Sequence, residues 1–228
     1  MPPPDFGPLV ERALDFAPAG SRVGLGTGRA AAAFVEALAA RVRGGLRVVA
    51  VPTSEATADL ARRLGVPLTT LDETPELDVA IDGADEVDPA GDLIKGYGGA
   101  LVRERIVAAA ARRFVILVGH EKLVPVLGTR GKLPVEVVPF ARGPAARRLA
   151  ALGLRPELRC RDGRPVVTDN GDYILDCGTG PLADPARLEA DLRDIPGVVG
   201  TGLFLGMTPT VLVLHSDGTV AQYPPAER

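Results

Sequence analysis

The chain has 228 residues, long enough for one large domain or two small domains with a true core. Hydrophobic residues make up 46% of it and charged residues 24%, as expected of a globular protein, and no apolar run approaches the ~20 residues of a membrane span. The net charge of −3 comes from interspersed acids and bases, which excludes the basic footprint of a protein that binds nucleic acid or an anionic membrane.

The amino terminus and the cysteines favour a cytoplasmic location. The segment Met1-Pro2-Pro3-Pro4-Asp5 is not a signal peptide. Cys160 and Cys177 are the only cysteines, and their spacing fits neither a metal site nor a redox motif. We therefore expect two reduced thiols in a cytoplasmic protein.

The first half of the chain alternates predicted strands with predicted helices. Strands are predicted over residues 21–26, 47–51, 66–71, 77–81 and 114–118, and helices after residue 28 and over residues 54–64 and 99–113. Thr53 and Ser54 suit the N-cap of the second helix, and Gly65 suits its end. Alternation with short loops predicts an α/β fold, a parallel sheet with helices on both faces.

From about Lys132 the pattern changes. Strands are predicted over residues 133–138, 155–161, 166–175 and 198–204, and helices over residues 143–152 and 184–195. This β-α-β-β-α-β order predicts a small ferredoxin-like α+β domain. The turn Ser216-Asp217-Gly218 predicts a closing hairpin that returns to the first domain. We therefore expect one domain over residues 1–131 and 205–228, and a second over residues 132–204.

The loop Gly24-Leu25-Gly26-Thr27-Gly28-Arg29 follows the first predicted strand. A dinucleotide fingerprint needs glycine where Arg29 stands, and no Gly-Lys-Ser/Thr of a mononucleotide P-loop occurs. What remains is a glycine loop that opens a helix, whose free N–H groups suit a phosphate or another anion. A tight turn that binds nothing is the alternative.

Four carboxylates follow the strand predicted at residues 77–81. They are Asp82, Asp85, Glu86 and Asp88. Acids at the end of a buried strand are costly unless they meet water, a cation or a polar ligand. Three interpretations stay open: general acid–base catalysis on a polar substrate, a solvated acidic loop, and a divalent metal site that lacks a histidine or further ligands.

Glu104 is the least persuasive candidate from pattern alone. Val102, Ile106 and Ala109 make the predicted buried stripe of its helix, and Glu104 lies nearly opposite between two arginines. That pattern favours an exposed, ion-paired side chain. For His120, which follows a strand end, a structural role is favoured.

Several segments, taken together and in order, resemble the ribose-5-phosphate isomerase type A family. They are Gly24 to Gly28, Val51 to Thr57, Asp82 to Glu86, Leu93 to Glu104, Lys122 to Val124 and Leu133 to Glu136. The likeness runs from about residue 20 to residue 207. It implies a Rossmann-like α/β domain with a small α+β domain. It also implies a cofactor-free and metal-free enzyme of the pentose phosphate pathway that acts on a pentose 5-phosphate as a homodimer or homotetramer.

The resemblance also implies a role for each matching residue. Glu104 is the base that abstracts a proton, and Asp82 and Asp85 bind sugar hydroxyls and shuttle protons. Lys95 and the N–H groups of Gly96-Tyr97-Gly98 stabilise the oxyanion. The substrate-binding set is completed by Thr27, Gly28, Arg29 and Ala30 at the phosphate, by Gly83 and Ala84 beside the acids, and by Lys122 as a further cation.

The chain departs from the family pattern in its phosphate loop and in its lysine-glycine run. Arg29-Ala30 stands where the family has Ser-Thr, which removes two hydroxyl donors, although Arg29 can supply a bidentate grip. Tyr97 replaces the middle glycine of the Lys-Gly-Gly-Gly run. Two other functions remain to be weighed, a non-catalytic sugar-phosphate sensor and a relative of the acyl- or CoA-transferases.

Overall fold

The computed structural model describes residues 5–223, which divide into two compact units. Within that part of the chain, unit 1 comprises residues 5–84, 103–122 and 207–223. Unit 2 comprises residues 85–102 and 123–206. The domain boundaries expected from the sequence, at 131/132 and 204/205, stay a prediction.

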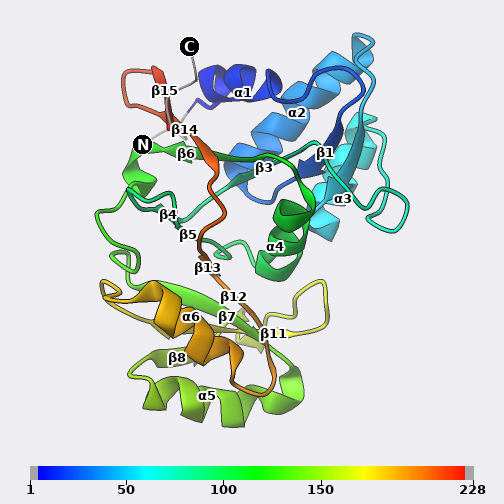
Figure 1. Cartoon of the computed structure of the whole chain (residues 1–228). Helices are drawn as coiled ribbons and strands as arrows, with labels where there is room; N and C mark the ends of the chain where they lie inside the picture. Colours follow the sequence, from blue (N-terminus) through cyan, green and yellow to red (C-terminus); the bar gives the residue numbers. More distant parts are fainter. Residues whose placement is uncertain (1–4, 224–228) are drawn as a thin grey trace. The chain divides into compact units, whose positions relative to one another are not determined.

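Unit 1 is built on a six-stranded sheet (Figure 1). In spatial order its strands are β15 (Val220–Tyr223), β14 (Thr210–Leu214), β6 (Phe114–Gly119), β3 (Val79–Gly83), β1 (Arg22–Leu25) and β2 (Val49–Pro52). All neighbours run parallel except β15, which pairs antiparallel with β14 through the predicted hairpin. The predicted parallel sheet and its closing hairpin are confirmed.

Helices cover both faces of this sheet. They are α1 (Gly7–Leu14), α2 (Arg29–Arg43), α3 (Glu55–Leu64) and α4 (Leu101–Ala110). The apolar sides of α1 and α2 join Val23 and Ile81 in one core on one face. On the other face Val107 of α4 packs against Gly24 and Ala80, where a Cβ on Gly24 would overlap its side chain. The α1 helix is not among the elements predicted from the sequence.

The ends of α3 are those that its sequence predicts. Ser54 is the N-cap, and its hydroxyl accepts a hydrogen bond from Thr57 N at 3.1 Å. Gly65 ends the helix in the left-handed conformation, with φ of 80°. Local side-chain and backbone chemistry therefore sets where this helix begins and ends.

Unit 2 contains a four-stranded antiparallel sheet. In spatial order its strands are β12 (Val198–Thr201), β7 (Lys132–Val137), β11 (Tyr173–Gly178) and β8 (Arg155–Leu158), with helices α5 (Arg142–Ala151) and α6 (Pro185–Arg193). The third strand of this set, β11, lies between the first two and runs antiparallel to both. This is the split βαβ plan, so the predicted ferredoxin-like arrangement is confirmed.

Two small sheets complete unit 2. A three-stranded sheet is formed by β13 (Leu203–Phe204), β5 (Leu93–Ile94) and β4 (Glu86–Val87). A two-stranded hairpin joins β9 (Cys160–Arg161) to β10 (Arg164–Pro165). The hairpin turn is Asp162-Gly163, and both residues have the positive φ that a tight hairpin turn requires.

Several predicted strands are wrong in extent. Residues 66–71 contribute only a single bridge from Leu68 to Ala50, so this segment is not a strand of the sheet. The strand predicted over 166–175 instead occupies 173–178, because residues 168–172 form a turn in which Thr168 N donates to Asp172 O and Gly171 N donates to Thr168 O. The strand predicted over 198–204 breaks at Gly202, whose close approach to the Lys95 carbonyl leaves no room for a side chain.

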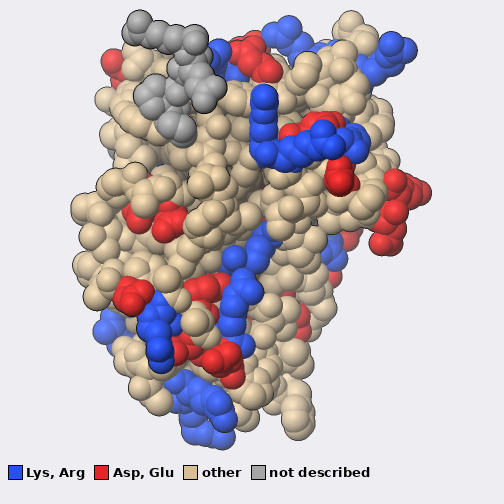
Figure 2. Space-filling view, viewed as in Figure 1, with Lys and Arg blue, Asp and Glu red and all other residues tan. Residues whose placement is uncertain are grey.

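No helix within residues 5–223 combines the length and the hydropathy needed to cross a membrane. Figure 2 shows basic and acidic side chains interspersed on the face that it presents. This view matches the mixed charge pattern of the sequence.

Candidate active site

The predicted site residues divide between the two units. Unit 1 carries Thr27, Gly28, Arg29, Ala30, Asp82, Gly83, Ala84, Glu104 and Lys122. Unit 2 carries Asp85, Lys95, Gly96, Tyr97 and Gly98.

In unit 1 the order of the strands reverses beside β1. The chain passes from β1 through α2 to β2, and β3 then lies on the opposite side of β1. In open α/β sheets a crevice forms outside the carboxyl ends of the strands at such a switch point. The glycine loop after β1 and the acid at the end of β3 both lie there.

Asp82 braces the glycine loop. Its side chain is 2% exposed, and its Oδ1 accepts hydrogen bonds from Thr27 N at 3.1 Å and from Gly83 N at 2.7 Å. A Cβ on Gly26 would overlap the Asp82 carboxyl group. The missing side chain at Gly26 is therefore what allows the loop and the carboxylate to meet.

A cluster of hydroxyl groups holds the other side of this loop. Thr27 Oγ1 lies 2.8 Å from Thr53 Oγ1 and 2.9 Å from Ser54 Oγ. Thr57 Oγ1 donates to the carbonyl oxygen of Gly26 at 3.0 Å. The sequence pattern identifies Thr53 and Ser54 only as helix-capping residues, because the contact with Thr27 spans 26 residues of chain.

The amino end of α2 is suited to an anion. The helix begins at Arg29 after Gly28, whose φ is 113°, and Ala32 N donates to the Gly28 carbonyl at 2.8 Å. Amides that precede this first bond have no acceptor within a helix, and the helix dipole adds positive potential there. Arg29 is exposed at this end and Ala30 is half-buried. A phosphate site here stays a prediction that this geometry supports.

The expected buried stripe of α4 is wrong. Ile106 is 50% exposed and Ala109 is exposed, whereas Leu101, Glu104 and Val107 are buried. The helix turns this way because the small residues Gly24 and Ala80 admit Val107 onto the sheet. Glu104, 4% exposed, therefore belongs to the buried side and not to the surface.

Contacts along α4 place Glu104 level with the end of β3. Arg112 N donates to Leu77 O just beyond the end of α4, and Val107 lies near Ala80. Helix α4 and strand β3 therefore run in opposite directions, so earlier residues of α4 lie beside later residues of β3. The three residues from Val107 back to Glu104 advance about 4.5 Å along the helix axis. Two residues from Ala80 to Asp82 advance about 6.6 Å, and Asp82 shares the sheet face of Ala80. We infer that the Glu104 and Asp82 carboxyl groups are close neighbours.

The neighbour of Glu104 on α4 makes the ion pair that the sequence suggests for this region. Arg103 Nη1 lies 2.9 Å from Glu55 Oε1, at the first turn of α3. The hydrogen bond from Arg103, with its positive charge, lowers the pKa of Glu55. This pair links α3, which begins beside the hydroxyl cluster, to α4, which carries Glu104.

Lys122 and His120 follow the carboxyl end of β6. They lie in a short 3₁₀ turn, η1 (His120–Lys122), and Lys122 is half-buried. Strand β3 lies between β6 and β1, so these two strands are about 10 Å apart. The ring of His120 stacks on that of His215 with centroids 6.3 Å apart, which agrees with a structural role for His120.

In unit 2, residues 95–98 form a loop after β5, the Lys95 loop. Lys95 is 2% exposed, and its Nζ lies 5.5 Å from the centre of the Phe204 ring. Tyr97 N donates to Asp85 Oδ2 at 2.9 Å. Burial, and secondarily the Asp85 charge, raises the pKa of Tyr97, so the phenol stays neutral. Asp85 and the Lys95 loop therefore form one connected set.

The two remaining acids of the cluster have structural partners. Glu86 is fully buried and accepts from Gly128 N at 2.6 Å and Arg130 N at 2.7 Å. Asp88 Oδ1 accepts from the amides of Ala90 and Asp92 at 2.9 Å each and closes a turn. Within this cluster of four acids, Glu86 and Asp88 thus have structural roles, and Asp82 and Asp85 remain candidates for chemistry.

Across residues 5–223 no group of three or more His, Cys, Asp or Glu side chains is placed to hold a metal ion. This finding gives no support to the metal interpretation of the acid cluster. The expectation of a cofactor-free and metal-free enzyme stays a prediction.

One known protein family matches most of this chain. The sequence profile of ribose 5-phosphate isomerase A (phosphoriboisomerase A) matches residues 49–218. The chain belongs to this family. The ribose-5-phosphate isomerase A of Roseiflexus castenholzii is 55% identical over 223 residues, 96% of this chain and 95% of that protein. That of Gloeobacter violaceus is 52% identical over 219 residues, 95% of each chain.

Solved structures of the isomerase family have the same fold. The ribose 5-phosphate isomerase of Plasmodium falciparum superposes with a TM-score of 0.90 at 35% identity, covering 94% of this chain and 95% of that one. A D-ribose-5-phosphate isomerase solved in complex with phospho-erythronic acid gives a TM-score of 0.90 at 37% identity, covering 97% and 96%. The α/β fold expected from the sequence is thereby confirmed.

Proposed function

We propose that this chain interconverts D-ribose 5-phosphate and D-ribulose 5-phosphate through an ene-diolate, in the non-oxidative pentose phosphate pathway. The observation that carries the mechanism is the burial of the Glu104 carboxyl group, on the helix whose Val107 packs against β1 at Gly24. A carboxyl group placed among apolar residues and a second acid is suited to proton transfer.

The reaction moves one proton between two adjacent carbons. Glu104 takes the proton from C2 of the open-chain aldose, and the electron pair forms the C1–C2 double bond of the ene-diolate. A proton passes from the C2 oxygen to the C1 oxygen, and Glu104 then returns its proton to C1. Asp82 and Asp85 are proposed to hold the hydroxyls and assist ring opening and this shuttle.

The developing negative charge needs a preorganised donor. We assign this role to Lys95 and to the amides of the Lys95 loop, since fixed donors stabilise an oxyanion without reorganising. The phosphate is assigned to Thr27, Gly28, Arg29 and Ala30 at the amino end of α2, with Gly83, Ala84 and Lys122 completing the substrate contacts.

A carboxylate ligand is expected to bind, because phospho-erythronic acid carries its carboxylate where the substrate has the reacting carbons, and a relative of the family was solved with it.

A non-catalytic sugar-phosphate sensor is the alternative. A sensor needs the anion site and hydroxyl contacts but has no use for a buried base, so Glu104 and the family membership favour an enzyme. The homodimer or homotetramer is a proposal that rests on the resemblance alone. The cytoplasmic location is also a proposal, supported by two cysteines whose spacing suits two reduced thiols.

Glu104→Gln tests the proposal directly. Purified wild-type protein should convert ribose 5-phosphate to ribulose 5-phosphate without added metal or nucleotide. The variant keeps the size of the side chain but cannot accept the proton, so kcat should fall about 10²- to 10⁴-fold with little change in KM. Glu36→Gln, at an exposed position of α2, is the matched control and should turn over like wild type.

Wild-type turnover by Glu104→Gln would remove Glu104 from the role of base. A wild-type protein that binds ribose 5-phosphate without converting it would instead support the sensor.

A further inference from the structure

Arg159, which follows β8, bridges an acid and the Lys95 loop. Its Nη1 donates to the carbonyl oxygens of Gly96 at 3.0 Å and Tyr97 at 3.2 Å. Its Nε and Nη2 donate to the two oxygens of Asp176 on β11, at 2.9 and 2.5 Å. The Arg159 and Asp176 side chains are only 12% and 18% exposed. A planar guanidinium can satisfy all four acceptors at once, whereas an ammonium cannot.

These contacts fix the direction of two consecutive peptide groups. In a trans peptide the C=O and N–H point in opposite directions. Because Arg159 holds the Gly96 carbonyl, the N–H of Tyr97 points away from it, and that N–H donates to Asp85 Oδ2 at 2.9 Å. Holding the Tyr97 carbonyl likewise directs the N–H of Gly98 away from Arg159.

The loop has few other constraints of its own. Gly96 has φ of 102° and Gly99 has φ of 91°, a conformation that glycine adopts without strain. One backbone bond, from Gly99 N to Gly96 O at 3.0 Å, closes the turn. A side chain at residue 96 would press on Leu101, whose Cβ would lie 2.9 Å from the added Cβ.

We infer that Arg159 and Asp176 are a positioning pair that sets the Lys95 loop and the Asp85 carboxylate for proton transfer. Neither residue of the pair is assigned a contact with the substrate in the proposed function, and the pair acts through the Gly96–Tyr97 peptide. This inference rests on the proposed function, because it assigns the pair to the residues that handle the ene-diolate.

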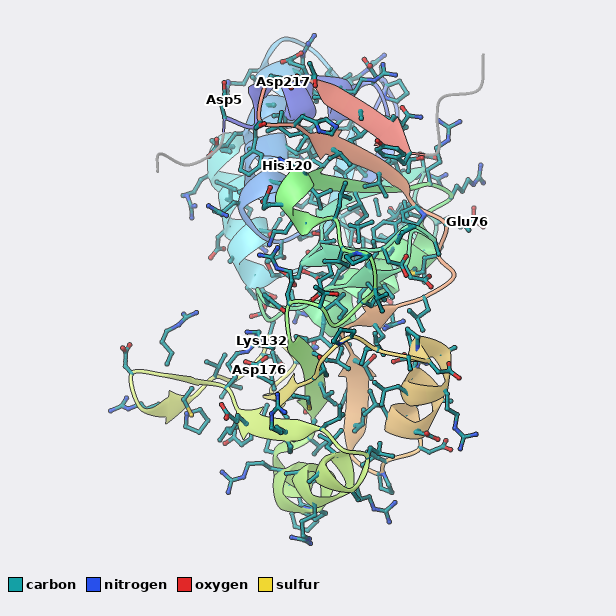
Figure 3. The ribbon with its side chains drawn as sticks, turned by 90° about the vertical axis from the view of Figure 1, so that its left-hand side faces the viewer. Asp5, Glu76, His120, Lys132, Asp176 and Asp217 are labelled. Carbon is teal, nitrogen blue, oxygen red and sulfur yellow. The ribbon has the colours of Figure 1, made fainter. Side chains whose placement is uncertain are left out.

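Lys132 reinforces the same loop from β7. Its Nζ lies 3.5 Å from Asp176 Oδ2, and Figure 3 shows the two residues next to one another. The same Nζ lies 4.2 Å from the centre of the Tyr97 ring, and Tyr97 Oη donates to the Lys132 carbonyl at 3.1 Å. The ring of Tyr97, where the family pattern has glycine, is thus held against the pair by the neighbouring strand.

Arg159→Lys is the test, because it keeps the charge and the stem but loses the planar fork. We expect kcat to fall about 10- to 100-fold with KM for ribose 5-phosphate nearly unchanged, since small misplacements of catalytic groups cost rates of that order. Arg161→Lys, an exposed arginine of the adjacent hairpin, is the matched control and should retain wild-type kinetics.

Inhibitor binding separates positioning from general damage. Phospho-erythronic acid carries a carboxylate in place of the reacting carbons, so its affinity should fall in Arg159→Lys roughly in step with kcat/KM. Inorganic phosphate lacks that group, so its inhibition constant should stay within about twofold of wild type. A parallel loss of both affinities would overturn the inference.

Asp176→Asn provides the second variant should Arg159→Lys fold poorly. It should reproduce the loss of kcat, and the double variant should be no slower than the slower single variant, because the pair acts as a unit. Additive losses, or wild-type kcat in folded Arg159→Lys, would overturn the inference. An inactive wild-type protein would instead refute the proposed function, so the two failures are distinguishable.

Discussion

Arg29 occupies the first position of α2, where a positive charge opposes the helix dipole. No acidic residue lies in the first turn of this helix to offset it. Such a placement costs about 0.3–1 kcal/mol at an exposed site. A bound phosphate would reverse the sign of the interaction and accept hydrogen bonds from the guanidinium. Arg29, which departs from the family pattern, is therefore expected to destabilise the free protein slightly and to stabilise the complex with a bound phosphate.

Replacing Arg29 by Ser should have opposite effects on binding and on stability. We expect KM for ribose 5-phosphate to rise several-fold, while the free energy of unfolding without phosphate stays equal or rises slightly because the unfavourable charge is gone. Steady-state kinetics and urea unfolding measure the two quantities. Arg63→Ser, at an exposed position of α3, is the control.

An unchanged KM would show that Arg29 does not contact the phosphate. Repeating the kinetics with arabinose 5-phosphate and allose 6-phosphate shows whether the altered loop also changes which sugar phosphate is preferred.

At the scale of elements, the glycine loop is held by partners from three directions. Asp82 comes from β3, Thr53 from the end of β2, and Thr57 from the first turn of α3. Thr57 Oγ1 is central, since it donates to Gly26 O and also accepts from Ser54 Oγ at 3.0 Å. The start of α3 and the phosphate loop are thereby one structural unit.

Thr57→Val removes this hydroxyl with almost no change of shape. The variant leaves buried polar groups without their partner, so the free energy of unfolding should fall by about 1–3 kcal/mol in urea titrations. We also expect a higher KM, because the loop that faces the phosphate loses a constraint. Thr57→Ser keeps the hydroxyl and should lie closer to wild type in KM. Equal stability of Thr57→Val and wild type would count against this network.

At the scale of the whole molecule, the two cysteines lie in different environments of unit 2. Cys160 is exposed on the β9–β10 hairpin, whereas Cys177 is buried in the core cluster beneath the four-stranded sheet. Burial raises the pKa of Cys177 to about 12, so its thiol stays protonated and unreactive in the folded chain.

Thiol labelling should therefore distinguish the two cysteines. Wild-type protein should react rapidly at one thiol, and the Cys160→Ser variant should react only as fast as unit 2 opens. Sub-denaturing urea should accelerate labelling of Cys177, because opening exposes the core. Fast labelling of Cys160→Ser in native buffer would contradict the burial of Cys177.

Much of the fold follows from the sequence by itself. Periodicity and capping chemistry predict the parallel sheet, the extent of α3, and the split βαβ order of unit 2, because these depend on local backbone preferences and on apolar spacing. The strand at 66–71 is mispredicted, and the strands at 155–161 and 166–175 are predicted with the wrong extent, since short apolar runs do not reveal whether a neighbouring strand edge is available.

Tertiary structure decided which acids matter. The sequence places four acids close together and predicts Glu104 on the surface, because the positions of apolar residues alone indicate another buried side for this helix. Val107 packs at Gly24 on the sheet, and Glu104 on the same helix is buried. Glu86 accepts hydrogen bonds from backbone amides distant in the chain, so its role is structural. Contacts between residues far apart in sequence leave no periodic signal, and they are what separates the proposed base from the structural acids.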